Sequence, residues 1–257
     1  MRSNTQEHRD FVRSKFPDAF ELFYAIFEGT VDEVQNRLAA GDNPNAISIL
    51  GTTPIFYATQ FSSKLDKAEV LFSAGAVINS WDNQGRHPLH HNSFCEPCSA
   101  WLLSHGADPN AAVLPAKEKQ FDPIGWTALH MAVARGFLST TELLLAYRAD
   151  PNRQSQDGST PLHVAVRQQK LYKRLIRTLI DAGADVNIIN SVGDTPLHEV
   201  LSHSGQHSHA VIRLLLFRGA RVDIRNTSGL FPSEMLPDTP FGNTLKPLFI
   251  RHLPKSD

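Results

Sequence analysis

The sequence contains an internal repeat, and this feature limits most strongly what the chain can fold into. A segment of the type Gly-x-Thr-Pro-Leu-His recurs, in exact or altered copies, at Gly51, Gly85, Gly125, Gly158, Gly193 and, in degraded form, Gly229. A second segment, Gly-Ala-Asp-x-Asn, lies between these copies and ends at Asn45, Asn79, Asn110, Asn152, Asn187 and Asp223. Two coupled motifs at a period of about 34 residues predict a stack of similar units, because one such unit cannot bury its apolar face alone.

Each repeat unit is predicted to contain two helices. The hydroxyl of Thr160 can cap a helix, and Pro161 suits the first turn because it has no N–H to satisfy. Apolar residues follow at helical spacing, and a second helix is expected around Leu175–Ile180. Gly183 then stands where a helix commonly ends in a left-handed backbone conformation. The unit is therefore a helix, a turn, a helix and a loop.

This pattern resembles the ankyrin-repeat family over roughly residues 18 to 236. The resemblance implies an all-α fold, an ankyrin-repeat solenoid of stacked helix-turn-helix units with β-hairpin loops that project as fingers from one edge. It also implies a concave surface that binds other proteins. In the family, the histidines of the Thr-Pro-Leu-His segment make structural hydrogen bonds, and this role is carried over to His90, His130, His163 and His198.

The resemblance gives an expected domain organisation. We expect a flexible segment at 1–17, a single ankyrin-repeat domain over 18–253, and a tail at 254–257. Within the domain, the expected parts are an N-terminal cap repeat at 18–47, repeats near 48–80, 81–120, 121–153, 154–188 and 189–224, and a C-terminal cap at 225–253. A capping box at Asp18–Glu21 predicts the start of the first helix, and Asn243–Leu253 is expected to close the stack.

Two positions depart from the repeat pattern. Fourteen residues, 111–124, separate Asn110 from Gly125 where five are usual, so this finger is predicted to be nine residues longer. An enlarged loop on a rigid scaffold often carries function, but lengthening a loop also costs little, and both interpretations stay open. Arg148 stands where the other copies mostly have glycine; if the site needs a positive φ, arginine costs about 1 kcal/mol.

Cysteine and histidine groups suggest chemistry without completing a site. Cys95-Glu-Pro-Cys98 has the spacing of half a zinc site or of a thiol redox motif, but no second cysteine pair exists. We interpret the two cysteines as small apolar side chains. The turn containing His203, His207 and His209 has no carboxylate or cysteine fixed nearby. The sequence therefore predicts no metal site and no cofactor.

Composition and missing signatures exclude several function classes. The sequence has no phosphate-binding glycine loop, zinc-protease motif or nucleophile elbow, so we predict that the protein is not an enzyme. The net charge of −1 predicts no nucleic-acid or membrane partner. The basic run Lys170, Lys173, Arg174 and Arg177 is either a solvated helix face or a contact for an acidic partner. Two cysteines and no long apolar segment favour a cytoplasmic location, with the nucleus as a second option, and we expect a monomer.

A partner-binding surface is predicted from the positions that flank each repeat glycine and end each first helix. These positions hold Ile49, Leu50, Phe61, Trp81, Arg86, Phe94, Phe121, Ile124, Trp126, Arg135, Gln156 and Arg167. Exposed aromatic and arginine side chains often dominate binding energy. The hypothesis is a groove lined by Phe61, Trp81, Phe94 and Trp126 with Arg86 and Arg135. In the alternative, Trp81 or Phe94 packs between irregular repeats, since tryptophan is mostly buried.

The sequence as a whole predicts a non-catalytic interaction module or scaffold that binds an unidentified protein or peptide. One alternative is the substrate-recognition subunit of a ubiquitin ligase, since Thr244–Leu253 faintly resembles the start of a suppressor-of-cytokine-signalling box, although Phe249 departs from it. Another alternative is a pathogen effector that acts in a host cell. The resemblance also indicates Asn187 as a site for asparaginyl hydroxylation, against an ordinary hydrogen-bonding role in its loop.

Overall fold

The computed structural model describes residues 2–16, 19–116, 121–168, 173–202, 208–236 and 240–252. The chain forms two compact units, Met1–Ala128 and Leu129–Asp257. Helices dominate both units. No β-strand is assigned within the described ranges, where the β-pairing consists of an isolated bridge between Ala112 and Thr127. The predicted all-α solenoid fold is confirmed.

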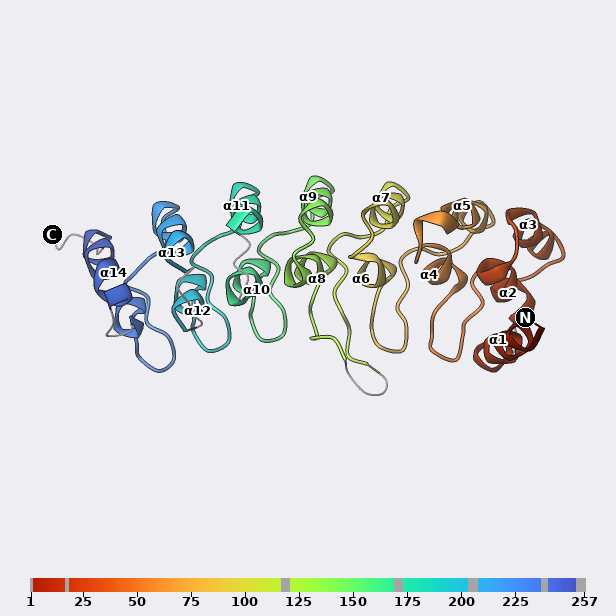
Figure 1. The fold of residues 1–257 in the computed structure, drawn as a ribbon, viewed down its shortest axis with the longest axis horizontal. Helices are drawn as coiled ribbons and strands as arrows, with labels where there is room; N and C mark the ends of the chain where they lie inside the picture. The colour runs from red at the N-terminus through yellow and green to blue at the C-terminus, as the bar shows by residue number, and fades with distance from the viewer. Residues whose placement is uncertain are drawn as a thin grey trace. The chain divides into compact units, whose positions relative to one another are not determined.

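The first unit consists of an N-terminal helix followed by helix pairs. Its elements are α1 (Arg2–Lys15), α2 (Phe20–Glu28), α3 (Val31–Ala39), α4 (Pro54–Ala58), the 3-10 turn η1 (Ser62–Lys64), α5 (Leu65–Ser73), α6 (Pro88–Asn92) and α7 (Glu96–Ser104). In Figure 1, α2, α4 and α6 lie beside the finger loops, and α3, α5 and α7 form an outer row. The core lies between these two rows, where Leu22, Ile55, Leu71, Leu89 and Leu102 are fully buried.

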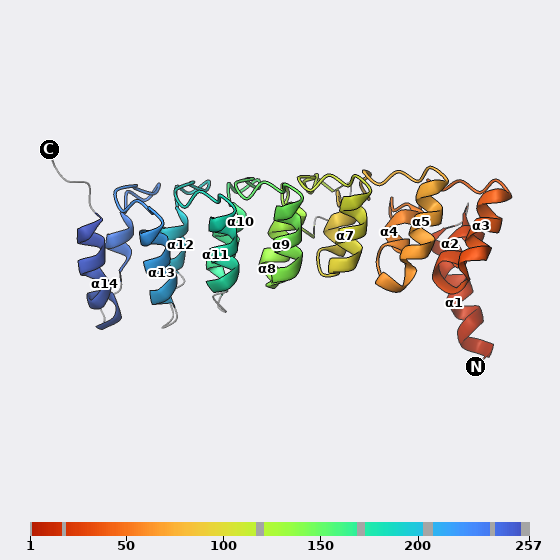
Figure 2. The same ribbon diagram turned by 90° about the horizontal axis from the view of Figure 1, so that it is seen from above.

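The second unit repeats the same arrangement. Its elements are α8 (Ala128–Arg135, which begins on the last residue of the first unit), α9 (Leu138–Ala146), α10 (Pro161–Arg167), α11 (Lys173–Asp181), α12 (Pro196–Ser202), α13 (Ser208–Phe217), the 3-10 turn η2 (Pro232–Met235) and α14 (Pro240–Arg251). Figure 2 shows that the connecting loops of each unit run along one edge. The final helix carries the buried side chains of Leu245 and Phe249, so it packs onto its unit. Leu253, the last residue of the segment expected to close the stack, lies outside the described residues.

Helices begin where the Thr-Pro pairs predict, at Pro54, Pro161 and Pro196. Pro88 also begins a helix, although His87 and not threonine precedes it. At α10, the Thr160 hydroxyl accepts a hydrogen bond from the His163 N–H at 3.4 Å, while the Nδ1 atom of His163 accepts one from the Thr160 N–H at 3.2 Å. Two backbone donors at the helix start are thereby satisfied.

The N-terminal segment differs from the expectation of flexibility. Residues 2–15 form α1, in which Val12 is fully buried, and Phe16 directly after it stacks on Phe23 with ring centroids 3.9 Å apart. These apolar side chains cover the open end of the first helix pair, which an end repeat would otherwise expose to water. The polar composition of this segment hid these two core residues from sequence analysis. The expected cap Asp18 lies outside the described residues, and Ala19 is the N-cap of α2.

Asparagines at the ends of the loops connect successive repeats. In the first unit, the Asn45 amide donates to the Gly75 carbonyl at 3.0 Å and its oxygen accepts from the Val77 N–H at 2.7 Å. Asn152 makes the same pair of bonds to Gly183 and Asp185 in the second unit. Each side chain thus satisfies one acceptor and one donor of the next loop, and this amide ladder fixes the spacing between repeats.

Candidate protein-binding surface

The fingertips are shaped by a polar residue three positions before each repeat glycine. In the first unit, the Ser48 hydroxyl accepts hydrogen bonds from the N–H groups of Leu50 and Thr52, at 3.1 and 3.2 Å. Asp82 accepts from the N–H groups of Gln84 and Arg86 through one carboxylate oxygen, both at 2.9 Å. Such side-chain turns hold the intervening residues outward. Sequence analysis missed this recurring position, although a Ser, Asp or Asn three residues before each repeat glycine indicates such a turn.

A cavity of about 160 Å³ lies between two adjacent fingers of the first unit and the helices behind them. Three of the predicted residues, Ile49, Leu50 and Arg86, line it together with Thr52, Phe56, Tyr57, Gln60, Asn83, Gln84 and His91. Leu50 is 50% exposed at its rim. A space of this size is sufficient for one apolar side chain or aromatic ring.

The charge of Arg86 in the cavity lining is neutralised by a carboxylate of the protein itself. Arg86 forms an ion pair with the buried Asp82 at 3.0 Å, and His91 donates from Nε2 to the same carboxylate at 2.9 Å. Burial alone would raise the pKa of Asp82, but the hydrogen bonds from His91 and from the Arg86 N–H outweigh it and hold the pKa below its ordinary value. Arg86 therefore serves first to balance a buried carboxylate, which the sequence analysis did not anticipate.

The aromatic residues predicted to line a groove do not line this cavity. Phe61, Trp81 and Phe94 are all exposed, but none lines the cavity. The Trp81 indole N–H donates to the Ala112 carbonyl at 3.2 Å, and its ring lies edge-on to His87 with centroids 5.6 Å apart. Trp81 thus contacts the neighbouring finger and is still 39% exposed. This arrangement lies between the two alternatives, an exposed binding residue and a residue packed between repeats.

The lengthened finger carries three predicted residues. Phe121 is 68% exposed, while Ile124 and Trp126 are partly buried. Backbone bonds close the base of the finger: the Val113 N–H donates to the Trp126 carbonyl at 2.7 Å, and the Leu114 N–H donates to the Gly85 carbonyl at 2.9 Å. Part of the insertion, residues 117–120, lies outside the described residues.

Arg135, Gln156 and Arg167 belong to the second unit. The first two are exposed, whereas Arg167 is partly buried and pairs with the buried carboxylate of Glu199. Its guanidinium also donates to the Ser159 hydroxyl at 2.9 Å. The hydrogen bond and charge of Glu199 raise the pKa of Arg167, so this cation is fully retained. Arg167, like Arg86, is used inside its own unit.

The four repeat histidines lie in the core and link neighbouring segments. In His163 and His198, Nδ1 accepts from a backbone N–H, so Nε2 carries the proton and donates to the carbonyls of Asp194 and Leu230, at 3.0 and 3.2 Å. His130 bonds Ser159 and His90 bonds Ala111 in the same manner. Burial lowers the pKa of all four, to about 3 for His90 and about 4 for His130. They are neutral at pH 7.

Asn187, the predicted hydroxylation site, is part of the amide ladder. Its amide donates to the Gly219 carbonyl at 3.1 Å, and its oxygen accepts from the Arg221 N–H at 2.8 Å. Both polar ends of the side chain are therefore used within the fold. Hydroxylation of Asn187 stays a prediction.

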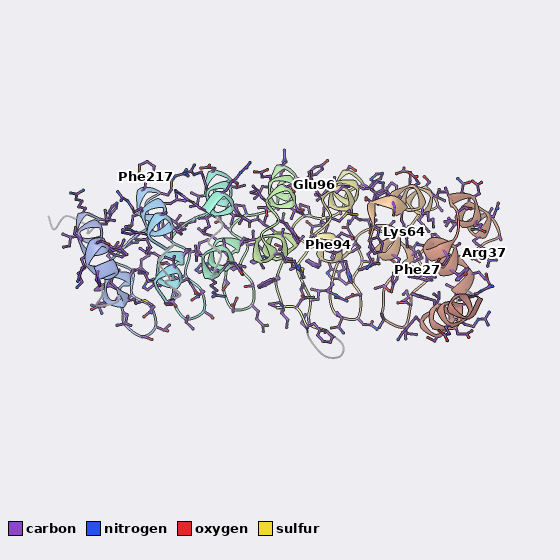
Figure 3. All side chains as sticks on the ribbon, in the orientation of Figure 1. Phe27, Arg37, Lys64, Phe94, Glu96 and Phe217 are labelled. Carbon is purple, nitrogen blue, oxygen red and sulfur yellow. A yellow bond between two sulfur atoms is a disulfide. The ribbon has the colours of Figure 1, made fainter. Side chains whose placement is uncertain are left out.

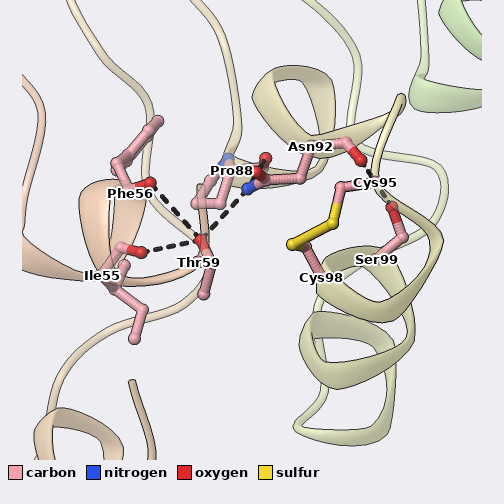
Figure 4. The surroundings of a disulfide bond; sticks show 8 residues. All are labelled: Ile55, Phe56, Thr59, Pro88, Asn92, Cys95, Cys98 and Ser99. Carbon is pink, nitrogen blue, oxygen red and sulfur yellow. Dashed lines mark hydrogen bonds between the residues drawn. A yellow bond between two sulfur atoms is a disulfide. The ribbon is translucent and has the colours of Figure 1, made fainter. Parts of the chain in front are cut away.

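The cysteines differ from the sequence interpretation. Cys95 and Cys98 form a disulfide at the start of α7, with Cα atoms 5.3 Å apart (Figure 4). The first turn of the helix brings the two side chains together, which the assignment as separate small apolar groups overlooked.

In the His-rich turn, His203 and His207 lie outside the described residues, as does Lys170 of the basic run. Lys173, Arg174 and Arg177 are exposed on α11. Within the described ranges, no group of three His, Cys, Asp or Glu side chains is arranged to hold a metal ion.

Helix pairs that recur along the chain, joined by fingers with exposed tips, define a helical-repeat protein. A family model described as ankyrin repeats in three copies matches residues 129–226, and a second, described as ankyrin repeats in many copies, matches residues 91–145. The chain is an ankyrin-repeat protein. None of its described helices is both long enough and apolar enough to cross a membrane.

Known ankyrin-repeat proteins resemble the chain over most of its length. The mouse B-cell lymphoma 3 protein homolog is 32% identical over 181 residues, which cover 68% of this chain and 38% of the relative. Human ankyrin repeat and SOCS box protein 16 is 29% identical over 180 residues, covering 67% and 37%. The crystal structure of the Bcl-3 ankyrin repeat domain matches with a TM-score of 0.72 at 25% identity, over 90% of this chain and 97% of that domain. The chain thus matches less than two fifths of the length of either curated relative.

Proposed function

We propose that this protein is a non-catalytic interaction module that binds a partner protein at the fingertip cavity of its first unit. The observation that carries the proposal is the cavity between two adjacent fingers, with the exposed apolar side chains of Ile49 and Leu50 at its rim. Exposed apolar groups beside a concave site are typical of protein interfaces.

The cavity lining indicates what the partner presents. Phe56 and Tyr57 supply apolar surface at the back of the cavity, while Arg86 is already paired with Asp82. Gln84 adds a polar side chain to the lining. A partner segment that inserts one apolar side chain fits these features.

The test compares surface variants in a quantitative pull-down. The double variant Ile49→Ala/Leu50→Ala and the single variant Gln84→Ala are compared with wild type and with Phe217→Ala. Phe217 is the control because it is 82% exposed at the outer end of α13, in the other unit (Figure 3). We expect the fingertip variants to lose about tenfold or more in affinity for the captured partner at unchanged thermal midpoint, while the control binds normally. Equal binding by all four proteins would exclude this cavity as the binding site.

A second candidate function is substrate recognition in a ubiquitin ligase. It is favoured by the similarity to human ankyrin repeat and SOCS box protein 16, whose name describes a repeat domain joined to such a box. In this chain, Leu245 and Phe249 of the segment that faintly resembles a box are buried in α14. Co-purification with elongin-type adaptors would support it, and its absence would leave the simple interaction module. No feature of the described residues favours the pathogen-effector alternative.

We also propose a monomer located in the cytoplasm, with the nucleus as a second option. Sedimentation of the purified chain at several concentrations tests the first point. Imaging of a fluorescent fusion tests the second.

A further inference from the structure

The disulfide between Cys95 and Cys98 occupies a position suited to chemistry. Cys95 is the N-cap residue of α7, and Cys98 is the third residue of that nine-residue helix, with Pro97 between them. Cys95 is partly exposed, while Cys98 is fully buried. Of the two residues, Cys95 is therefore the one open to solvent, and Cys98 is shielded. Phe94 and Glu96, which flank Cys95, are both exposed (Figure 3).

The backbone around the disulfide is held by bonds that do not depend on it. The Cys95 N–H donates to the Asn92 carbonyl, and the Ser99 N–H donates to the Cys95 carbonyl, both at 2.9 Å. The Ser99 hydroxyl also donates to the Asn92 carbonyl at 2.9 Å, and the buried Asn92 amide donates to Thr59 and Pro88 (Figure 4). The helix start is thus anchored from both sides. Breaking the disulfide leaves these bonds in place, so the two sulfurs stay close enough to rejoin.

Cys95 stands at the N-terminus of α7, where the partial positive charge of a helix attracts anions, and the carboxylate of Glu96 follows it directly in the chain. A disulfide that links residues three apart closes a very short loop, so it constrains the unfolded chain less than a long-range one would. Its main consequence is then reactivity rather than stability.

We infer that Cys95 and Cys98 form a reversible thiol–disulfide exchange site that reacts with small thiols such as glutathione, with Cys95 as the exchanging sulfur. In the reducing direction, a thiolate attacks the sulfur of Cys95, the disulfide breaks, and Cys98 leaves as a thiolate that takes up a proton. A second thiolate attacks the mixed disulfide and releases Cys95. Two molecules of thiol are oxidised to one disulfide, while the protein disulfide is reduced to two thiols.

The first test measures reversibility in the full-length protein. The chain is equilibrated in mixtures of reduced and oxidised glutathione, quenched with acid, labelled with a maleimide and weighed by intact-mass spectrometry. We expect one reversible two-electron transition between an unlabelled form and a form with two labels, with the same far-UV circular dichroism at both ends. Failure of the reduced protein to reform the disulfide, or loss of helix on reduction, would show a purely structural bond and overturn the inference.

The second test separates the two sulfurs. Cys98→Ser leaves the accessible cysteine, and Cys95→Ser leaves the shielded one, so the pair forms a matched set whose folding is checked by circular dichroism. With oxidised glutathione, Cys98→Ser is expected to form a single glutathione adduct at least about tenfold faster than Cys95→Ser. Equal rates in two folded variants would contradict the assignment of Cys95. If either serine variant is unfolded, the rates at which a maleimide labels Cys95 and Cys98 in the reduced wild-type chain, read by peptide mass, decide the same question.

Discussion

The ring of His90 donates from Nε2 to the carbonyl of Ala111 at 3.0 Å. The corresponding histidines in the second unit bond the residue directly after the next repeat glycine, as His163 does with Asp194. By that rule the partner of His90 would be Trp126, but the Trp126 carbonyl accepts the N–H of Val113 instead. The lengthened finger therefore supplies its own first residue as the acceptor and uses the displaced carbonyl to close its base.

The close approach of this finger to Gly85 gives the first prediction. A Cβ atom at Gly85 would lie 2.0 Å from the Leu114 carbonyl oxygen, whereas a Cβ at Gly106 would meet no atom within 4 Å; both glycines have positive φ. Gly106→Ala should cost about 1 kcal/mol of unfolding free energy, the ordinary penalty of a left-handed alanine. Gly85→Ala should cost at least about 1 kcal/mol more, because the backbone must move. Urea denaturation of both variants measures the difference, and equal losses would mean that the finger does not pack there.

Arg148 gives the second prediction. Among the described residues, Arg148 is the one non-glycine residue with a positive φ, at 65°. The equivalent position of the next repeat is occupied by Gly183, which has a φ of 95°. Arg148→Gly removes a left-handed penalty of about 1–2 kcal/mol but adds backbone entropy to the unfolded chain worth about 0.5–1 kcal/mol. The net expectation is a stabilisation of about 0.5–1 kcal/mol, seen as a higher thermal midpoint. Arg148→Ala is the control and should not stabilise; a lower midpoint for the glycine variant would argue against strain at this site.

The buried histidines predict a loss of stability in mild acid. Burial lowers the pKa of His90 to about 3 and of His130 to about 4, from an ordinary value of 6.5. Below pH 6.5 the unfolded chain therefore binds more protons than the folded one, so stability is complete above that pH and falls as the pH drops toward 4. Each such histidine contributes a slope of about 1.4 kcal/mol per pH unit within this window.

Urea midpoints at pH 7, 6 and 5 measure this slope. Replacing His130 by glutamine keeps a hydrogen-bonding side chain but removes one titrating ring, so this variant should be less stable at pH 7 and less sensitive to acid. An unchanged slope would show that other groups control the acid response.

Lys67 gives the fourth prediction. Its ammonium group is buried and donates to the carbonyls of Ala25, Ile26 and Gly29, at 3.1, 2.9 and 2.7 Å. These carbonyls end α2, so the side chain acts as a C-terminal cap from another helix. Lys67→Met should destabilise the protein by about 2 kcal/mol or more, since it removes the Lys67 hydrogen bonds to the Ile26 and Gly29 carbonyls, while the Ala25 carbonyl keeps its bond from the Gly29 N–H.

The matched control is Lys64→Met. Lys64 lies over the rings of Phe27 and Phe61 at 5.0 and 5.5 Å from their centroids. It is the N-cap residue of α5, but its side chain makes no capping hydrogen bond there. Such a contact is worth about 0.5–1 kcal/mol at a partly exposed site. A loss at Lys67 no larger than at Lys64 would count against the capping role.

The repeat pattern predicted the fold because its signals are local. A Thr-Pro pair sets a helix start within one turn, so α10 and α12 could be placed from a few residues. The burial of Val12 could not be predicted in this way, since it depends on an exposed helix end that only the folded unit presents. The pairing of Arg167 with Glu199 could not be predicted for the same reason. The two residues are 32 positions apart in the sequence, and only packing of the folded unit brings their charges together.

The candidate surface was predictable in outline only. Exposure of Ile49 and Leu50 followed from their place beside a repeat glycine, but the cavity needs a second finger, whose Gln84 and Arg86 are set by the turn at Asp82. A pattern along one repeat contains no information on how two neighbouring tips face each other. The disulfide was missed for a related reason, because side-chain identity was considered without the geometry of a helix start.

The amide ladder has a consequence for how such a chain can change over generations. Asn45 and Asn152 address only backbone N–H and C=O groups of the following loop, and every residue except proline offers both. The amide ladder therefore places almost no demand on the identity of the loop residues that it joins, unlike side-chain contacts between repeats such as Arg167 with Glu199. The ladder can persist while those loop residues change, and the fingertips remain free to diverge toward new ligands.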